Sequence, residues 1–340
     1  MKLKNATVVI TGASSGIGRA TALRFAKEGA NLVLAARSED ALEEVAQQCR
    51  RHRVQALAVP TDVTDMNAVD ELALAAVEEF GGIDVWVNDA AVSVFSPFLD
   101  MPLDDFRRVL TVDVMGYVHG ARAALPIMQK QGKPGKGHGV LINVSSVSGV
   151  VPQPYVAPYS MAKAAVRALG TSLRSELMLQ KSKIEVVSIL PAAIDTRFFQ
   201  HSGNYTGRQV KAMPPVYPPE LVAKAILKAA AKPKHEVVVG AIAKSMVKQH
   251  KVSPTSVEAS MAVQTATGHL SLEKSAPNGT GILYAPITSV EEASITGGWK
   301  GKKRTGRRVA LALATGSAAF VALNRTFSLG RGKRAPSGNR

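Results

Sequence analysis

The feature that most constrains this chain is a regular alternation, over residues 6–240, of short apolar runs with longer amphipathic stretches. Short runs rich in β-branched residues predict buried strands, and the stretches between them predict helices. Strands and helices that take turns along a chain build a parallel sheet with helices on both faces. The sequence therefore predicts an α/β, doubly wound parallel sheet of about seven strands, at residues 6–11, 31–36, 54–59, 83–88, 139–145, 184–190 and 236–239.

Charge divides the chain into three parts. The formal net charge is +16, of which residues 1–240 carry +5, residues 241–298 carry none and residues 299–340 carry +11. The middle part is rich in Ser, Thr, Ala, Gly and Pro and shows little apolar periodicity, which is typical of a linker. We expect a catalytic domain at 1–245, a flexible linker at 246–298 and a mostly disordered basic tail at 299–340.

The basic tail encloses an uncharged, apolar segment at residues 309–323. Fifteen residues are fewer than the ~20 that span a bilayer, so a transmembrane helix competes with a short interfacial helix on anionic lipid and with a solvated tail. Nucleic acid is the least favoured partner. Because Cys49 is the single cysteine and no signal peptide is visible at the N-terminus, we expect a cytoplasmic protein, either free or held at the cytoplasmic face of the membrane.

A glycine-rich turn follows the first predicted strand directly. It reads Thr-Gly-Ala-Ser-Ser-Gly-Ile-Gly over residues 11–18, and a helical pattern begins behind it. Glycines let the backbone approach a ligand closely, and the free N–H groups of a helix N-terminus attract an anion such as a pyrophosphate. We expect a nucleotide phosphate site here, although an ordinary tight connection can have the same spacing. The expected contacts are Gly12, Ser14, Ser15, Gly16, Ile17 and Gly18.

The loop after the second predicted strand favours NADP over NAD. In folds of this kind an acidic side chain there binds the ribose hydroxyls of NAD, whereas a basic one pairs with the 2'-phosphate of NADP. Here the strand ends at Ala36 and is followed by Arg37, whose planar guanidinium matches a phosphate. A solvated loop arginine is the alternative, and Glu39 or Asp40 could still be the acid if the loop is shifted.

Three polar residues further along predict proton-transfer chemistry. Tyr159 and Lys163 are four residues apart on a predicted helix and so share one of its faces. A phenol with a pKa near 10 is a poor base, and lowering that pKa by about three units needs roughly 4 kcal/mol, which a nearby lysine and an oxidised nicotinamide could supply. Ser146 lies at the end of the fifth predicted strand, where its hydroxyl can hold a substrate oxygen.

Together these motifs resemble the short-chain dehydrogenase/reductase family, in its short single-domain branch, over about residues 4–240. The resemblance implies a Rossmann-type fold, a homodimer or homotetramer, and hydride transfer between nicotinamide C4 and a carbonyl or alcohol carbon. It implies that Tyr159 is the acid/base, that Ser146 positions the substrate oxygen, and that Lys163 adjusts the phenol and binds the nicotinamide ribose. The implied cofactor contacts also include Asp62, for which an Asx turn is the alternative role, and Val63, Asn88, Ala90, Pro191 and Thr196.

The chain departs from the family pattern in three places. Residues 88–91 read Asn-Asp-Ala-Ala where the family has Asn-Asn-Ala-Gly, and Pro191 is followed by Ala192 in place of glycine. Asp113 stands where the family has a catalytic asparagine that helps to hold a water in the proton relay. An aspartate can pair with Lys163 and weaken its hold on the phenolate, so we expect a working but altered relay.

An irregular stretch at residues 192–217 is long enough to be a lid over the site. It carries Phe198 and Phe199, which favour a hydrophobic carbonyl or alcohol substrate, although both rings could simply pack the lid onto the body. His201, in the same stretch, is more typical of a loop histidine than of a second acid.

The sequence thus predicts an NADP-dependent oxidoreductase. The alternative is a nucleotide-binding sensor or interaction protein, weakened in catalysis by Asp113 and acting through its basic tail. The seven histidines show no metal-ligand spacing, so we expect no metal.

Overall fold

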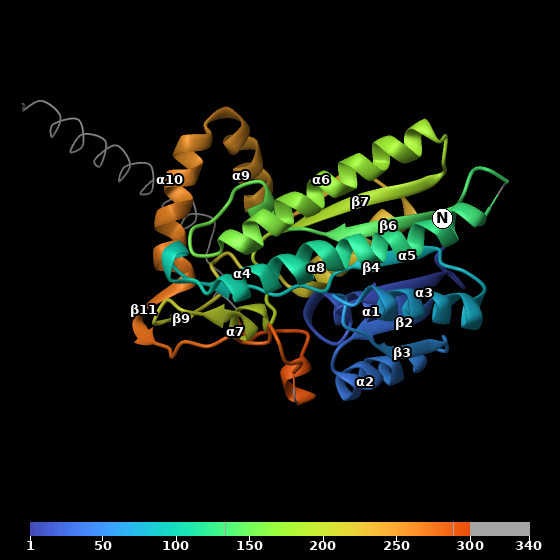
Figure 1. Ribbon diagram of the computed structural model, residues 1–340, viewed down its shortest axis with the longest axis horizontal. Coiled ribbons are helices and arrows are strands. Elements are labelled where there is room, and N and C mark those ends of the chain that lie inside the picture. Colours follow the sequence, from blue (N-terminus) through green and yellow to red (C-terminus); the bar gives the residue numbers. More distant parts are fainter. Residues whose placement is uncertain (133, 288, 300–340) are drawn as a thin grey trace, which may run out of the picture.

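A single seven-stranded parallel sheet organises the molecule (Figure 1). The computed structural model describes residues 1–132, 134–287 and 289–299. The α/β fold predicted from the sequence is confirmed, and each strand begins and ends within two residues of its predicted range. The strands, in the order of the sheet, are β10 (Glu236–Val239), β7 (Ile184–Pro191), β6 (Gly139–Val144), β4 (Val85–Asn88), β1 (Thr7–Thr11), β2 (Asn31–Ala36) and β3 (Ala56–Pro60).

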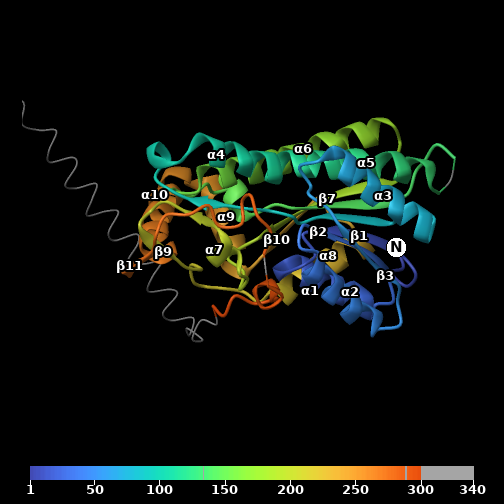
Figure 2. The ribbon, with the colours of Figure 1, turned by 60° about the horizontal axis from the view of Figure 1, so that its bottom comes forward.

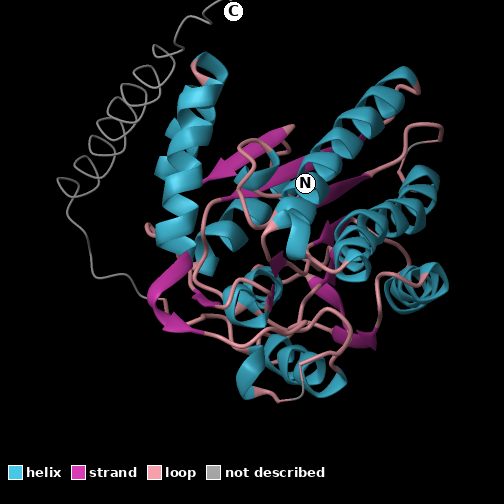
Figure 3. Ribbon diagram, turned by 60° about the vertical axis from the view of Figure 1, so that its left-hand side comes forward, coloured by secondary structure: helices cyan, strands magenta, loops and turns pink. Residues whose placement is uncertain are grey.

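Helices cover both faces of the sheet, as Figure 3 shows. Alternate residues of β1 pack against opposite layers, because successive side chains of a strand point to opposite faces: Val8 and Ile10 belong to one apolar cluster and Val9 to the other. The first layer contains α1 (Gly16–Lys27), α2 (Glu39–Arg50) and α8 (Pro219–Ala231), and the second contains α3 (Met66–Phe80), α5 (Gly116–Lys130) and α6 (Ala157–Leu179).

One long helical stretch on the second face is interrupted by a wide turn. Helix α4 (Leu103–Leu110) continues into a single π-helical turn, Thr111–Met115, and then into α5. Extra residues in such a turn break the regular helical register and frequently occur at functional sites. Here the turn carries Asp113, which is fully buried.

The chain changes direction in the sheet between β1 and β4. It moves outward through β2 and β3 and then returns to pair β4 with the other side of β1. Ligands of doubly wound sheets bind beyond the carboxyl ends of the strands at this switch point. The loops after β1, β2, β4 and β6 therefore meet at one edge of the sheet.

The predicted lid, residues 192–217, contains three short elements. These are α7 (Phe198–His201), β8 (Gly203–Asn204) and β9 (Arg208–Val210). Strand β8 pairs with β5 (Val94–Phe95), so the lid is fastened to the loop that follows β4.

Residues 246–298 do not form the flexible linker that we expected. They continue α9 (Ala241–Val252), which crosses the expected boundary at residue 245, and add α10 (Pro254–Gln264) and β11 (Leu270–Ser275). Strand β11 pairs with β9, and the Arg208 side chain donates hydrogen bonds to the carbonyls of Leu270 and Ser271. The expectation failed because α10, rich in Ser, Thr and Ala, fully buries only one large side chain, Met261, and so shows little apolar periodicity.

The basic tail lies beyond this ordered region. Apart from Trp299, it falls outside the described residues, and so does its apolar segment 309–323. Within the described ranges, no helix combines the length and the apolar character that a membrane crossing needs.

Two leucines of β11 test whether the C-terminal segment is packed. Leu270 is 1 % exposed and Leu272 is 73 % exposed. We expect Leu270→Ala to lower the free energy of unfolding by about 2–4 kcal/mol, because it leaves a cavity, and Leu272→Ala to change it by less than about 0.5 kcal/mol. Urea unfolding followed by circular dichroism measures both. Equal, small effects would indicate that the segment is not packed on the body.

Candidate active site

The glycine-rich turn joins β1 to the N-terminus of α1 at the switch edge of the sheet. Gly12 has a φ of +73°, and a Cβ there would lie 2.8 Å from the backbone of Ala90, so no other residue fits without strain. Ser15, the N-cap of α1, makes no side-chain hydrogen bond to the helix, and the first turn carries no acidic residue. The positive end of the helix is therefore not neutralised by its own side chains and can attract an anion.

A cavity of about 310 Å³ extends from this turn to α6. It brings together residues predicted for the phosphate, ribose, nicotinamide and catalytic positions, although these come from loops far apart in the sequence. The predicted residues that line it are Gly12, Ser14, Ser15, Gly16, Ile17, Arg37, Asp62, Val63, Ala90, Ser146, Tyr159, Lys163, Pro191 and Thr196.

Three predicted residues do not line the cavity. Gly18 lies behind the turn, where a Cβ would clash with the carbonyl oxygen of Gly12. The Asn88 side chain points into the core, since its Oδ1 accepts a hydrogen bond from the indole of Trp86 and its Nδ2 donates one to Asn143. Asp113 is fully buried beneath the cavity wall, so it acts through neighbouring side chains.

Arg37 is held by a segment that is distant in the sequence. Its guanidinium donates hydrogen bonds to the carbonyls of Ile282 at 2.6 Å and of Leu283 and Ala285 at 3.3 Å. Burial lowers the pKa of Arg37, but Asp62 opposes this effect. Glu39 and Asp40, which the sequence left open as acids, form the first turn of α2 and do not line the cavity.

Asp62 has the Asx turn that was left open as its alternative role. Its Oδ1 accepts hydrogen bonds from the amide of Thr64 at 2.9 Å and from its hydroxyl at 2.8 Å. Its Oδ2 pairs with Arg108 at 3.0 Å. These bonds outweigh the effect of burial and lower the pKa of Asp62. The carboxylate nevertheless lines the cavity, so the turn does not exclude a contact with a ligand.

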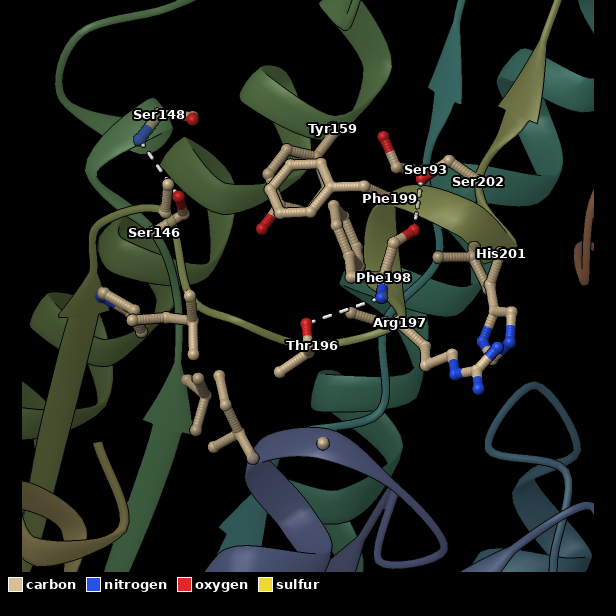
Figure 4. A pocket seen from close by; sticks show the side chains of 18 of the residues that line it. Ser93, Ser146, Ser148, Tyr159, Thr196, Arg197, Phe198, Phe199, His201 and Ser202 are labelled. Atoms are coloured by element: carbon tan, nitrogen blue, oxygen red, sulfur yellow. Dashed lines mark hydrogen bonds between the residues drawn. The ribbon is translucent and has the colours of Figure 1, made fainter. Parts of the chain in front are cut away.

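Ser146 and Tyr159 face the cavity from two different elements (Figure 4). Ser146 follows β6, and its Oγ accepts a hydrogen bond from the amide of Ser148, which fixes its position. Tyr159 belongs to α6, with its ring packed 5.3 Å from that of Phe198 in the lid. Burial raises the pKa of the phenol, and a hydrogen bond with the hydroxyl of Ser146 opposes part of this effect. A substrate oxygen placed between them would meet a positioning hydroxyl and a proton donor.

The ammonium of Lys163 is almost completely withdrawn from water. Lys163 is 1 % exposed, and its Nζ lies 3.1 Å from Asp113 Oδ2, 3.1 Å from the Tyr117 hydroxyl and 3.4 Å from the Val144 carbonyl. The other oxygen of Asp113 accepts a hydrogen bond from the amide of Val92 at 2.8 Å. The predicted pairing of Asp113 with Lys163 is thus present, and the Tyr117 hydroxyl is a further hydrogen-bond partner of the ammonium.

The phenol of Tyr159 is a poor base in the cofactor-free protein. Burial raises its pKa to about 12, and although the charge of Lys163 lowers it, that of Asp113 raises it again. Without a bound cofactor, Tyr159 is therefore protonated at neutral pH. A protonated phenol is suited to donate a proton to a substrate oxygen rather than to remove one.

Asp89 places a second carboxyl close to the lysine. Burial raises its pKa to about 8, although Lys163 and a hydrogen bond from the Gly18 amide lower it. The side chain takes the place of the second asparagine of the family pattern and lines the cavity. Because its pKa lies near neutrality, Asp89 can change charge within the physiological pH range.

The far end of the cavity is apolar and aromatic. Phe198 and Phe199 of the lid line it, and the ring of Phe198 also packs on Tyr159 of the body. Burial lowers the pKa of His201. Further apolar and aromatic lining comes from Phe95, Val156, Met213, Met246, Met261 and His269, beside the polar side chains of Ser93, Gln153, Arg197, Ser202 and Gln264.

Several residues in and behind the cavity wall were not predicted from the sequence. Tyr117 lies one turn after Asp113 and could have been found as a third acceptor on the same helix face. Met246 and Met261 were both assigned to the expected linker, where nothing in the composition pointed to a site. Ile282, Pro286 and Ile287 also line the cavity, and no local pattern predicts contacts across so many residues.

Comparison with known proteins agrees with this geometry. The family model described as short chain dehydrogenase matches residues 6–205. The uncharacterized oxidoreductase YxnA of Bacillus subtilis is 39% identical over 248 residues, which are 72% of this chain and 68% of the relative. An uncharacterized oxidoreductase of Staphylococcus aureus is 37% identical over 68% of this chain and 94% of its own length.

Solved structures share the fold of this chain over most of its length. A short-chain dehydrogenase/reductase of Burkholderia phymatum in complex with NAD has a TM-score of 0.68 and 26% identity, and the match covers 75% of this chain and 96% of that one. An alcohol dehydrogenase of Thermococcus sibiricus complexed with 5-hydroxy-NADP has a TM-score of 0.59 and 26% identity, over 69% of this chain and 95% of that one. This chain belongs to the short-chain dehydrogenase/reductase family of oxidoreductases.

Proposed function

We propose that this protein reduces the carbonyl group of a hydrophobic small molecule with NADPH, and catalyses the reverse reaction with NADP⁺. The observation that carries the proposal is the meeting of Ser146, Tyr159 and Lys163 in one cavity with the glycine-rich turn. A chain without catalysis has no chemical need for all three residues at that place.

The cavity fits a dinucleotide at both of its ends. The N-terminus of α1, which Ser15 does not cap with its side chain, and the close approach of Gly12 to Ala90 make a cradle for phosphates. Pro191, Thr196 and Lys163 also line the cavity. In the family, residues at these positions bind the nicotinamide and its ribose. These residues would hold NADP, which when bound supplies a hydride to the substrate carbon.

The choice of NADP over NAD rests on charge at the adenosine end. Strand β2 ends at Ala36 without an acidic residue. The positive charges of Arg37 and Arg108 there exceed the negative charge of Asp62. Arg37 has five N–H donors, and described carbonyls of the C-terminal segment use three of them. Two donors and the positive charge remain for a 2'-phosphate. Since relatives have been solved with NAD and with an NADP derivative, the family alone does not decide between them.

The chain's own groups perform the proton chemistry of the reduction. The hydroxyl of Ser146 holds the carbonyl oxygen, and Tyr159, protonated because burial raises its pKa to about 12, donates its proton to that oxygen. The phenolate that remains is stabilised by the charge of Lys163. Asp113 and Tyr117 keep the ammonium in place while this happens.

The lining favours an apolar substrate. Phe95, Phe199 and Met261 come from the loop after β4, the lid and α10, and enclose the space beyond Tyr159. Methionine side chains adapt to ligands of irregular shape, and apolar walls exclude water from the reacting carbonyl. A fatty, aryl or polycyclic ketone matches these walls better than a charged sugar.

Tyr159→Phe tests the function directly. We expect NADPH consumption with a panel of apolar ketones and aldehydes to fall by about 10²- to 10⁴-fold, because the proton donor is lost, while NADPH still binds. Tyr155→Phe, a matched control in the preceding loop, should change the rate by less than about twofold. Absence of turnover by the wild-type chain despite tight NADPH binding would instead favour a nucleotide sensor.

Asp113→Asn tests the altered relay. The negative charge of Asp113 raises the pKa of Tyr159, and alcohol oxidation needs the phenolate, so its rate rises as the pH passes through that pKa. Removing the charge should move this rise by about one unit toward lower pH. The readout is the pH–rate profile of NADP⁺ reduction, with Asp104→Asn as an exposed control. An unchanged profile would contradict a role of Asp113 in the relay.

Arg37→Gln tests the cofactor preference. A charge-assisted bond to a phosphate contributes about 1.5–3 kcal/mol, so the KM for NADPH should rise about 10- to 100-fold while that for NADH changes little. Arg51→Gln, exposed at the end of α2, is the control. An equal rise for both cofactors would mean that Arg37 serves only to hold the C-terminal segment.

A further inference from the structure

A segment near the described C-terminus runs along the whole cofactor cavity. We call residues 279–299 the C-terminal strap; Thr288 within it is outside the described residues. It begins at the lid, where Gly279 pairs with Asn204, and ends at Trp299 beside Thr196. Figures 1 and 2 show this segment, coloured orange to red, passing from β11 toward α1 and α2.

The first anchor of the strap lies at the adenosine end. Leu283 is fully buried among apolar side chains of the sheet and the second helix layer. Its carbonyl accepts hydrogen bonds from Arg37 at 3.3 Å and from Arg108 at 3.1 Å. Tyr284 donates a hydrogen bond to Asp105 at 2.8 Å. Two basic side chains and a buried leucine thus fasten this part of the strap.

The second anchor lies on α1 and α2, next to the phosphate turn. Ala293 is fully buried in a small cluster with Ala41 and Ile287. Its carbonyl accepts a hydrogen bond at 2.9 Å from Arg19, a buried arginine that also pairs with Glu44. The next carbonyl, that of Ser294, accepts one at 3.2 Å from the amide of Gly16. The strap therefore touches the turn that would cradle the phosphates.

The third anchor lies at the nicotinamide end. Asp195 Oδ1 accepts hydrogen bonds from the amides of Gly297 at 3.0 Å and Trp299 at 2.9 Å. The indole of Trp299 donates to the carbonyl of Thr196 at 2.9 Å and packs edge-on against Phe199. Both ends of the dinucleotide site are consequently joined by one continuous segment.

We propose that the C-terminal strap is the outer wall of the dinucleotide site and limits how fast the bound cofactor leaves. The proposal rests on the proposed function, since it needs a bound dinucleotide. Ile282, Pro286 and Ile287 line the same cavity as the glycine-rich turn, and apolar side chains of this kind can cover an adenine ring. A cofactor enclosed between the turn and the strap can leave only after an anchor opens.

Opening the strap at an anchor breaks buried contacts, and it moves only a short segment of the chain. Leu283 does not line the cavity, so its side chain can influence the cofactor only through the residues that it holds in place, the strap among them. Opening of a short segment is set by its own buried contacts, and most affinity differences between related complexes reside in the dissociation rate. Loosening one anchor should therefore speed release without changing any group that touches the cofactor.

The test is the dissociation rate of NADPH from the full-length chain, followed by its fluorescence after rapid mixing with excess NADP⁺. We expect Leu283→Ala to release NADPH at least tenfold faster than the wild type. Leu272→Ala, a matched change at an exposed leucine of β11, should release it at the wild-type rate within twofold. Trp299→Ala loosens the third anchor, at the nicotinamide end of the strap, and should also accelerate the release of NADPH. If Leu283→Ala does not fold, the result for Trp299→Ala decides the test.

Two other results would overturn the proposal in distinguishable ways. Variants that fold but release NADPH at the wild-type rate would remove the strap as a barrier and leave the proposed function intact. A wild-type chain that binds neither NADPH nor NADH would overturn both proposals together.

Discussion

The position of one buried ammonium group constrains much of this structure. Lys163 is shielded from water, and a buried charge without partners costs several kcal/mol, so its three acceptors must stay within reach. Those acceptors come from the wide turn before α5, from α5 itself and from the end of β6. The packing of α5 and α6 on the sheet and the π-helical turn at Asp113 are therefore parts of one arrangement that holds the lysine.

This arrangement also determines the chemistry of the site. The lysine lies close enough to the phenol ring of Tyr159, 5.4 Å from its centroid, to stabilise a phenolate once formed. Burial raises the pKa of Asp113 while the charge of Lys163 lowers it, and Asp113 in turn raises the pKa of Tyr159. Burial then leaves the phenol protonated in the free protein. An asparagine in place of Asp113 carries no charge and would not raise the pKa of Tyr159 in this way.

Local patterns predicted the sheet and the catalytic residues, because both depend on short-range spacing. The runs at β2 and β10 were predicted to the residue, and Tyr159 and Lys163 share a helix face whatever surrounds them. The C-terminal region was not predicted, because Leu270 and Leu283 become core residues only through partners far away in the sequence. The hydrogen bonds of Arg37 to residues 282–285 and the raised pKa of Tyr159 likewise follow from tertiary packing, which no local pattern encodes.

A single titration tests the central claim that burial and the Lys163–Asp113 pair leave Tyr159 protonated. Tyrosine labelled with ¹³C at Cζ reports the ionisation of each phenol by NMR, and the signal of Tyr159 is the one absent from the Tyr159→Phe spectrum. We predict that this signal stays at its protonated position in the cofactor-free protein up to pH 10, consistent with a pKa of about 12. A transition near pH 7 would show that the phenol is already activated and would contradict the account.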